Sequence, residues 1–420
     1  MRLKKLFILS AVALLGAAPA KITAQNSLLP WDTVLDYQLA AGKDAGGEAI
    51  VADAVGNVFS GGGATDAAGT NHAIVLKTDT TQANWYFSDD TNPDYTQYHS
   101  SIYALGLDAN GNAYSIGQLW PNSSLPTYWH VRKSSNGGVN WSNVDLYQYT
   151  PGRWAYATGF AADDKGNIYV VGIGADQTVV GSGKHTTTNS YNHWLVRKSP
   201  DEGQTWALVD DLQSFSGSTG AYGACFVPGA GVFAVGGQFP GTGNSSWVVR
   251  RSASGDQGTW STVDGHFALG AARAVAGDSH GNIYVAGIQV ITVTIKTHPL
   301  TTSSYYAWVT RKSSDGGNTW STVDTYEYDA QNRGAYAFGI GRNAAGNVVV
   351  AGEAYDGQHT RWIVRTPDSS GVWYTMDDFQ PGNGARANGV ATDAVGNLLV
   401  TGEANDGTSW HWIVRRLAAP

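Results

Sequence analysis

A short sequence pattern recurs seven times along this chain and restricts its fold more than any other feature. Six copies have small residues, then Asp or Asn, two residues, Gly-Asn and a β-rich run, as in "GFAADDKGNIYVVG". The seventh, "ACFVPGAGVFAVGG", keeps the pattern but lacks both the Asp and the Asn. The glycines of the pattern lie 50 to 65 residues apart, at Gly56, Gly111, Gly166, Gly231, Gly281, Gly346 and Gly396. A period near 50 residues with several short strands per unit predicts a β-propeller.

Each unit reads as four antiparallel strands. The small-residue run is strand one, as in residues 156–162, and Asp-x-x-Gly-Asn is a tight turn because Gly and Asn tolerate positive φ. The "NIYVVG" type of run is strand two, and W-x-V-R-K-S, as in residues 194–199, is strand three. Strand four starts at a second tryptophan, as in "WSTVD". The chain is therefore expected to be all-β.

The two ends of the chain predict how the ring closes. The seventh unit stops after strand three, at "WHWIVRRLAAP", whereas the segment "WDTVLDYQ" near the start matches "WSTVDTYEY" at Trp31, Thr33 and Val34. Residues 31–37 should therefore pair beside residues 410–415 and complete the last blade. We expect residues 25–420 to form one seven-bladed propeller with no open edge at the seam.

A polar motif connects strands three and four. "SSDGGNTWSTVD" begins at Ser313, with related copies at Ser134, Ser199, Ser252 and Thr366. Its glycines suit a hairpin turn, its Ser and Asp can bind turn amides, and its Trp should pack into the core. S-x-D-x-G-x-T-W resembles the Asp-box, or BNR repeat, of sialidases and many other propellers. The resemblance implies a propeller; that superfamily includes enzymes, receptors and assembly factors, and the Arg-Ile-Pro signature of the sialidases is absent here.

The first residues predict export. Arg2, Lys4 and Lys5 precede an apolar run that ends at Ala18-Pro19-Ala20, so residues 1–24 read as a signal peptide cleaved after Ala20 or Ala24. No cysteine follows this run, which argues against a lipid anchor, and a secreted or periplasmic location is expected. The formal charge is −8 for the chain and −12 after residue 24, a poor match to nucleic acid or an anionic membrane.

The alternation of strands assigns the loops to two faces. The turns between strands one and two share a face with the S-x-D-x-G-x-T-W hairpins. The opposite face carries the connections between strands two and three, which are longest at residues 173–193 and 288–307. Because function tends to lie on variable loops above a rigid scaffold, we expect a site on this second face, near the axis.

Some positions obey the repeat and others break it. Small residues recur in strand one, where blades crowd at the axis: Ala49, Ala104, Gly159, Ala224, Ala274, Gly339 and Gly389. The neighbouring row toward the second face varies: Glu48, Tyr103, Thr158, Gly223, Arg273, Phe338 and Asn388. Residues that break a repeat are better functional candidates than residues that obey it. The recurring strand-three arginines read as structural, and Cys225, in the row of Ile50 and Leu105, reads as a buried apolar residue.

The candidate site residues follow from these rows and the adjoining loops. Ligand-binding candidates are His99, Tyr103, Arg153, Trp154, Arg273, Arg333, Tyr336, Arg386 and Asn388. Catalytic candidates are Glu48, Glu353 and Glu403, from the neighbouring blades one, six and seven, although the last two are more simply read as solvated or ion-paired. No metal spacing and no cofactor motif is found in the sequence.

Three functions fit this pattern. The first is binding of an extracellular glycan, acidic or polyhydroxylated, since aromatic rings stack on sugars and Arg or Asn binds hydroxyls and carboxylates. The second is a carbohydrate-active enzyme. A glycosidase would use two of the three glutamates, whereas a polysaccharide lyase would use a His or Tyr base beside an arginine, for which His99, Tyr103 and Arg153 could serve. The third is a scaffold for an exported protein partner.

Overall fold

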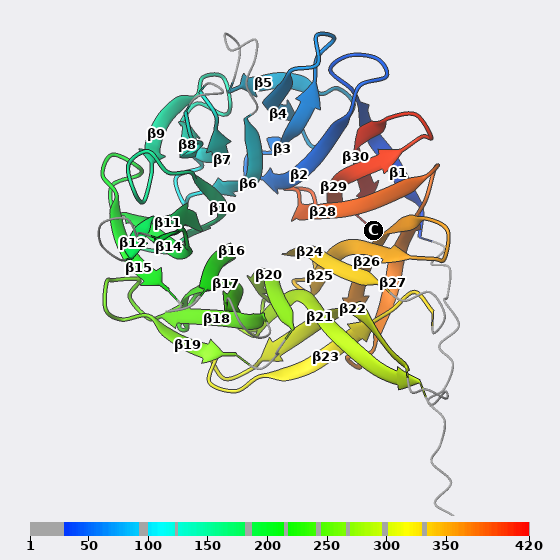
Figure 1. Ribbon diagram of the computed structural model, residues 1–420. Helices are drawn as coiled ribbons and strands as arrows, with labels where there is room; N and C mark the ends of the chain where they lie inside the picture. The colour runs from blue at the N-terminus through cyan, green and yellow to red at the C-terminus, as the bar shows by residue number, and fades with distance from the viewer. Residues whose placement is uncertain are drawn as a thin grey trace, which may run out of the picture.

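The computed structural model describes residues 29–91, 100–121, 125–180, 187–213, 217–240, 245–265, 269–295, 301–329 and 334–419. These residues form strands, turns and loops without a helix, so they include no helix that could cross a membrane. The expected signal peptide, His99 and Arg333 lie outside the described residues. The seven-bladed propeller expected from the repeat is confirmed, with seven sheets of four antiparallel strands around one axis (Figure 1).

The strands follow chain order from blade to blade. Blade one contains β2 (Ala45–Ala52), β3 (Val58–Thr65), β4 (Asn71–Thr78) and β5 (Tyr86–Asp90), and blade two contains β6 (Ser101–Leu107), β7 (Ala113–Leu119), β8 (Tyr128–Ser134) and β9 (Ser142–Tyr147). Blade three contains β10 (Ala155–Ala162), β11 (Ile168–Ala175), β14 (Asn192–Ser199) and β15 (Ala207–Leu212). Blade four contains β16 (Gly217–Val227), β17 (Gly231–Pro240), β18 (Ser246–Ser252) and β19 (Ser261–Asp264). Blade five contains β20 (Gly270–Gly277), β21 (Ile283–Ile295), β22 (Thr301–Ser313) and β23 (Ser321–Tyr326). Blade six contains β24 (Ala335–Arg342), β25 (Val348–Tyr355), β26 (Thr360–Pro367) and β27 (Trp373–Phe379). Blade seven contains β28 (Gly384–Thr392), β29 (Leu398–Asn405), β30 (Trp410–Leu417) and, from the start of the chain, β1 (Trp31–Tyr37). The first strand of each blade lies nearest the axis (Figure 1).

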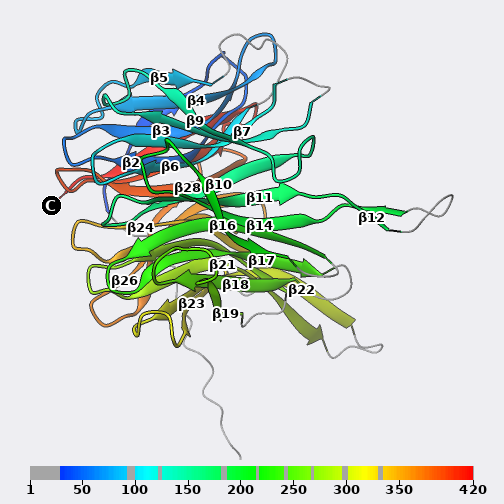
Figure 2. The same cartoon turned by 90° about the vertical axis from the view of Figure 1, so that its left-hand side faces the viewer.

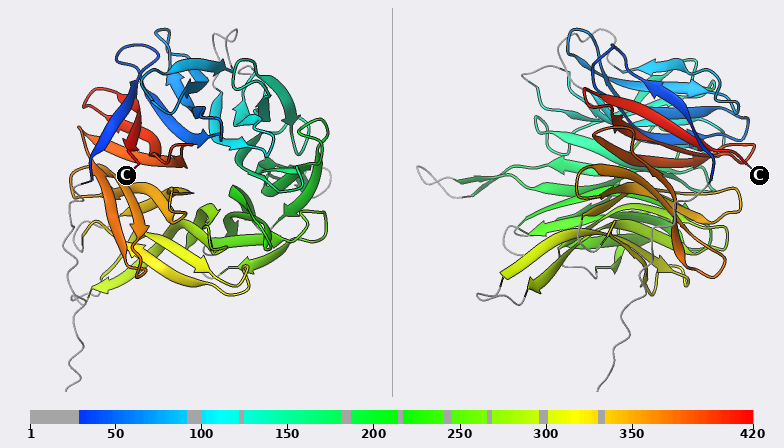
Figure 3. Two further views of the ribbon diagram at one scale, coloured as in Figure 1. Left: turned by 180° about the vertical axis from the view of Figure 1, so that it is seen from behind. Right: turned by 90° about the vertical axis from the view of Figure 1, so that its right-hand side faces the viewer.

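The N-terminal strand closes the ring as expected, although its partners are residues 412–417 and not residues 410–415. β1 pairs antiparallel with β30, from Trp31 opposite Leu417 to Tyr37 opposite Trp412. Figure 3 shows the blue β1 strand along the outer edge of the red seventh blade. Blade seven therefore combines strands from both ends of the chain.

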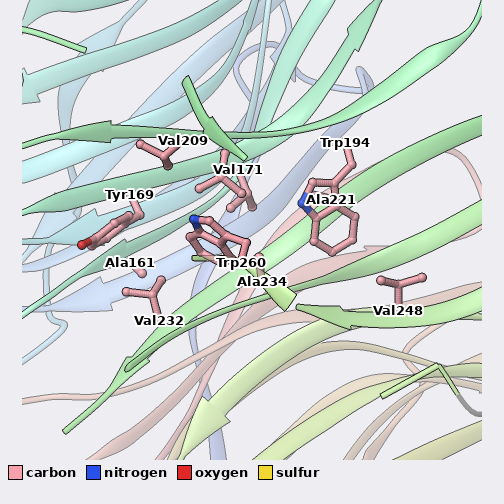
Figure 4. Close-up of a cluster of buried hydrophobic side chains, with 11 residues drawn as sticks. Ala161, Tyr169, Val171, Trp194, Val209, Ala221, Val232, Ala234, Val248 and Trp260 are labelled. Atoms are coloured by element: carbon pink, nitrogen blue, oxygen red, sulfur yellow. The ribbon is translucent and has the colours of Figure 1, made fainter. Parts of the chain in front are cut away.

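Buried tryptophans of strand three fill the spaces between blades. Six of them are fully buried: Trp129, Trp194, Trp247, Trp308, Trp362 and Trp412. Trp194 contacts blade four, where a Cβ at Gly236 would lie 2.7 Å from the ring, so glycine is required there. Figure 4 shows Trp194 and the hairpin residue Trp260 in the cluster between blades three and four. The strand-three rings are buried more completely than the half-buried hairpin tryptophans at positions 141, 206 and 320, which pack on the edges of such clusters.

The strand-three arginines join neighbouring blades. Each binds through two nitrogens to an aspartate of strand four in the preceding blade, with Nε–Oδ2 distances of 2.6 to 2.9 Å. The pairs are Arg132–Asp89, Arg197–Asp145, Arg250–Asp210, Arg311–Asp264, Arg365–Asp324 and Arg415–Asp377. At the seam between blades seven and one, Leu35 and Leu76 occupy the two equivalent positions and belong to one buried cluster.

The S-x-D-x-G-x-T-W hairpin is held by its own side chains. In blade five, Asp315 accepts hydrogen bonds from the amide of Thr319 (2.9 Å) and from its hydroxyl (2.6 Å), and Ser313 Oγ accepts one from the amide of Gly317 (2.8 Å). Gly317 has a φ of +92°, and a Cβ there would lie 2.8 Å from Phe233 of blade four. The glycine is needed for its left-handed conformation and for this close approach.

The expected register of blade four is wrong by one residue. Phe226 pairs with Val232, as Ala52 pairs with Val58 in blade one, so Gly231 is equivalent to Asn57 and not to Gly56. The turn of this blade lacks the Asp and Asn that mark the position elsewhere. Tyr222 therefore replaces Gly223 in the variable row, Gly223 replaces Ala224 in the small row, and half-buried Cys225 lies one row further along than expected.

The two faces of the propeller differ as expected. Figure 2 shows the hairpins of blades three and five extending from the same face of the ring. In blade three the extension is a two-stranded ribbon, β12 (Thr178–Val180) and β13 (Thr187–Asn189), and in blade five β21 and β22 themselves continue outward. Each first strand begins at this face, so its first half, with the variable row, lies toward it.

Candidate functional site

Every innermost strand carries a β-bulge at the same level. Pairing with strand two shifts by one residue in all seven blades, and the extra residues are Glu48, Tyr103, Thr158, Tyr222, Arg273, Phe338 and Asn388. A bulge redirects its side chain away from the regular alternation of the strand. These seven side chains line one cavity of about 310 Å³ on the axis, here called the axial cavity.

The residue after each bulge is small because backbones of adjacent blades approach closely. A Cβ at Gly159 would lie 2.9 Å from the Cα of Gly223 in the next blade. Asn388 also joins two blades, since its buried Nδ2 donates a hydrogen bond to the carbonyl of Gly47 at 2.9 Å. The framework is thus repetitive and tight, whereas the seven side chains that it directs into the cavity are of six different types, with tyrosine in two blades.

The structure brings the three catalytic candidates together around one arginine. Arg386 of β28 lies opposite Glu403 of β29, and its Nη2 is 3.1 Å from Glu403 Oε1. Its Nε lies 3.3 Å from Glu353 Oε2 of blade six. Glu48 of blade one interacts electrostatically with both Glu403 and Arg386. We call these four residues the acid cluster.

The acid cluster holds more negative than positive charge in a recessed site. Burial raises the pKa of Glu48 to about 7, with a further increase from Glu403, and the Arg386 guanidinium opposes both effects. Burial also raises the pKa of Glu353 and of Glu403, and for both the attraction of Arg386 opposes it. Glu48 is therefore the carboxyl group best placed to carry a proton near neutral pH.

Aromatic rings extend from the axial cavity in two groups. Trp154 stacks on Tyr156 with ring centroids 5.4 Å apart, and Tyr156 packs against Tyr103 at 5.9 Å. On the other side, Tyr336 lies between Tyr306, at 5.2 Å, and Phe338, at 6.0 Å. Rings arranged in this way offer flat apolar surfaces beside polar groups.

Arg273 differs from Arg386 in its surroundings. Its guanidinium lies 4.5 Å from the centroid of the Tyr222 ring, and its Nε, like that of Arg386, is buried without a hydrogen-bond partner among the described residues. No carboxylate of the described part of the chain forms an ion pair with it, whereas Arg386 has two. Arg273 is thus a cation of the axial cavity that can accept a new partner.

The remaining candidates are placed as follows. Half-buried Arg153 and Trp154 lie just before β10 on the same face, outside the lining of the axial cavity. Burial raises the pKa of Tyr103, which is opposite to what a lyase base requires. Tyr222 was not among the predicted residues because the expected register of blade four was wrong by one. Alignment of the apolar run that begins at Val232 with the run that begins at Val58 gives the correct register. No three His, Cys, Asp or Glu side chains of the described ranges are grouped to hold a metal ion.

Comparisons with known proteins add little to this geometry. No family model matches the chain, and no curated protein matches it. A solved structure of a protein of unknown function from Dyadobacter fermentans DSM 18053 is 13% identical, with 93% of this chain and 99% of that one covered and a TM-score of 0.48. YCF48 from Cyanidioschyzon merolae is 12% identical, covering 92% and 98%, with a TM-score of 0.48.

A third similar structure is the GH93 α-L-arabinofuranosidase of Fusarium graminearum with arabinobiose. It is 14% identical, covers 74% of this chain and 92% of that one, and has a TM-score of 0.43. Because all three TM-scores are below 0.5, these similarities carry no argument about what the chain binds or does. The function must be inferred from the site itself.

Proposed function

We propose that this protein is exported and binds a glycan, polyhydroxylated and either neutral or acidic, in the axial cavity on the face opposite the S-x-D-x-G-x-T-W hairpins. One observation carries the proposal. Seven equivalent bulge positions present seven side chains to a single cavity, while the residues beside them repeat. A purely structural axis would repeat at this level as well.

The chemistry of the cavity fits a sugar. Tyr103 and Phe338 line the cavity, with Tyr156 and Tyr336 packed beside them, and these rings offer apolar surface for one side of a pyranose or furanose. The carboxylates of the acid cluster can accept hydrogen bonds from hydroxyl groups, and Arg273 can donate to a hydroxyl or a carboxylate. Arg386 is already paired, so an acidic ligand would depend mainly on Arg273.

A glycan array followed by titration calorimetry tests the proposal. Arg273→Ala removes one charge-assisted hydrogen bond, so we expect affinity to fall by about 10- to 150-fold. The matched control is Arg342→Ala, an exposed arginine at the opposite end of the axis, which should leave affinity unchanged. Loss of binding in the control, with wild-type affinity in Arg273→Ala, would place the ligand on the wrong side of the ring and refute the proposal.

Glycoside hydrolysis is a second candidate, favoured by the acid cluster. A glycosidase needs one protonated and one ionised carboxyl group. Burial raises the pKa of both Glu48 and Glu403, but it raises that of Glu48 to about 7, whereas the ion pair with Arg386 favours the ionised form of Glu403. Glu48→Gln should then abolish release of reducing sugar and retain binding. Glu202→Gln, on the hairpin face, is the control that should retain both.

A further inference from the structure

A second hollow lies beside the axial cavity, over blade one. Its volume is about 220 Å³, and Glu48 and Tyr103 line both spaces, so the two meet at these side chains. We call it the blade-one hollow. It is on the same face as the acid cluster, because Glu403 forms part of its wall.

The hollow exists because blade one lacks two side chains that other blades have. Gly46 of β2 pairs with Gly63 of β3. In the same register, blade six places Tyr336 opposite Glu353, and blade seven places Arg386 opposite Glu403. Blade one thus lacks both side chains. The Glu403 carboxylate of blade seven reaches over Gly46, where a Cβ would lie 2.5 Å from Glu403 Oε2, so the unfilled space lies over Gly63.

Blade four shows that glycines alone do not make such a hollow. Its equivalent pair is Gly220 and Gly237, but hydrocarbon fills the space: a Cβ at Gly220 would lie 2.6 Å from Ile173 Cδ1, and one at Gly237 would lie 3.1 Å from Phe239. At Gly63 the nearest atoms to such a Cβ belong to the Asn71 amide, at 3.3 and 3.4 Å. The blade-one hollow is therefore open and polar.

The walls of the hollow combine an aromatic ring with hydrogen-bonding groups. Trp410 lines one side, and its backbone amide donates a hydrogen bond to Asp44 Oδ1 at 2.9 Å, which fixes the segment. Asp44, Asn71 and Glu403 supply carboxylate and amide oxygens. An indole beside carboxylates and an amide is a combination suited to one sugar ring.

We propose that the blade-one hollow is a second saccharide subsite, so that the ligand is an oligosaccharide running from the axis outward over blade one, past Glu48. This inference rests on the proposed glycan binding in the axial cavity. It assigns Asp44, Asn71 and Trp410 to the outer sugar, and it places Glu48 and Tyr103 between the two sugars.

The test uses saccharides of increasing length from the series that scores on the array. Wild-type affinity should rise by at least about tenfold between the monosaccharide and the di- or trisaccharide. Gly63→Ile introduces the residue that blades three and five have at this position, Ile173 and Ile288, and fills the hollow. It should lower oligosaccharide affinity to that of the monosaccharide and leave monosaccharide affinity unchanged.

Gln118→Ile is the matched control, since it puts the same residue at the same strand position in blade two, and it should alter neither affinity. Equal affinity for all lengths, or wild-type oligosaccharide binding by Gly63→Ile, would overturn the subsite. Glycan binding at the axis would still stand in that case if Arg273→Ala weakened it. Absence of binding to any saccharide would overturn both proposals.

Discussion

The blade interfaces and the axial cavity are built from the same repeat but treat charge differently. At six interfaces one arginine meets one aspartate through two hydrogen bonds, so each buried charge has its own partner. At the edge of the axial cavity, which Glu48 and Arg386 line, the three glutamates of the acid cluster share one arginine, and Arg273 has no acid partner among the described residues. The charges at the interfaces are therefore paired within the protein, whereas Arg273 at the axial cavity has no carboxylate partner among the described residues, as is typical of a functional site.

The seam between blades seven and one adds a third arrangement. There Leu35 and Leu76 replace both members of the ion pair, and they pack in one apolar cluster. Buried ion pairs can often be exchanged for apolar residues of similar volume, but loss of a single partner is costly. The seam therefore indicates that the pair is replaceable as a unit and not residue by residue.

Removal of the closing strand should have the largest effect. A chain starting after Tyr37 lacks β1, leaves β30 as an open edge and exposes the cluster around Leu35. We expect loss of a cooperative melting transition and aggregation, measured by circular dichroism and size-exclusion chromatography. A chain starting at Leu29 is the control, and an unchanged Tm in the shorter chain would contradict closure through β1.

Breaking one interface pair should be the next largest effect. Arg311 and Asp264 are both buried, so Arg311→Ala leaves an uncompensated carboxylate and should cost about 3–5 kcal/mol in urea unfolding. The double variant Asp264→Leu/Arg311→Leu copies the seam and should recover most of that loss. If the double variant is less stable than Arg311→Ala, the comparison with the seam is wrong.

Most of the fold could be predicted from the sequence because its signals are local and repeated. Turn glycines, the alternation of strands and the match between Trp31 and the later tryptophans establish blade number and closure. The predicted register of blade four was wrong because its turn lacks the Asp and Asn. In a strand, an error of one residue assigns every side chain to the opposite face of the sheet. The repeat itself could not show that the bulge directs its side chain into the cavity.

The candidate site was less accessible to sequence reasoning. The variable row identified Glu48, Tyr103 and Arg273, since a break in a repeat is visible without coordinates. The pairing of Arg386 with two glutamates depends on register and on contact between blades, which no local pattern encodes. The blade-one hollow was missed because it is defined by absent side chains, at Gly46 and Gly63.

The excess of carboxyl groups over cations in the acid cluster should appear as a pH dependence of stability. The folded-state pKa of Glu48 is raised to about 7, so ionisation costs folding free energy: the stability is fully present at acidic pH and is lost as pH rises through 7. Glu48→Gln removes this cost, and at pH 8.5 it should stabilise the protein by at most about 3 kcal/mol. Near pH 4.5 the variant and the wild type should have the same unfolding free energy. An equal difference at both values would show that ionisation of Glu48 is not responsible.

The smallest effect is expected on the hairpin face, where Asp315 is satisfied by its own turn. Hydrogen bonds from Thr319 and Ser313 hold the pKa of Asp315 down to about 2, so its contribution to stability is present at neutral pH and is lost as pH falls toward that value. Asp315→Ala should therefore lower Tm slightly at pH 7 and not at pH 2. Asp315→Asn should retain most of the stability, since Asn136 accepts the equivalent amide hydrogen bonds in blade two. Both variants should bind glycan with wild-type affinity in calorimetry, because the turn lies at the opposite face from the axial cavity. Lost affinity in a folded Asp315→Ala variant with wild-type Tm would mean that the hairpin face, and not the acid cluster, contacts the ligand.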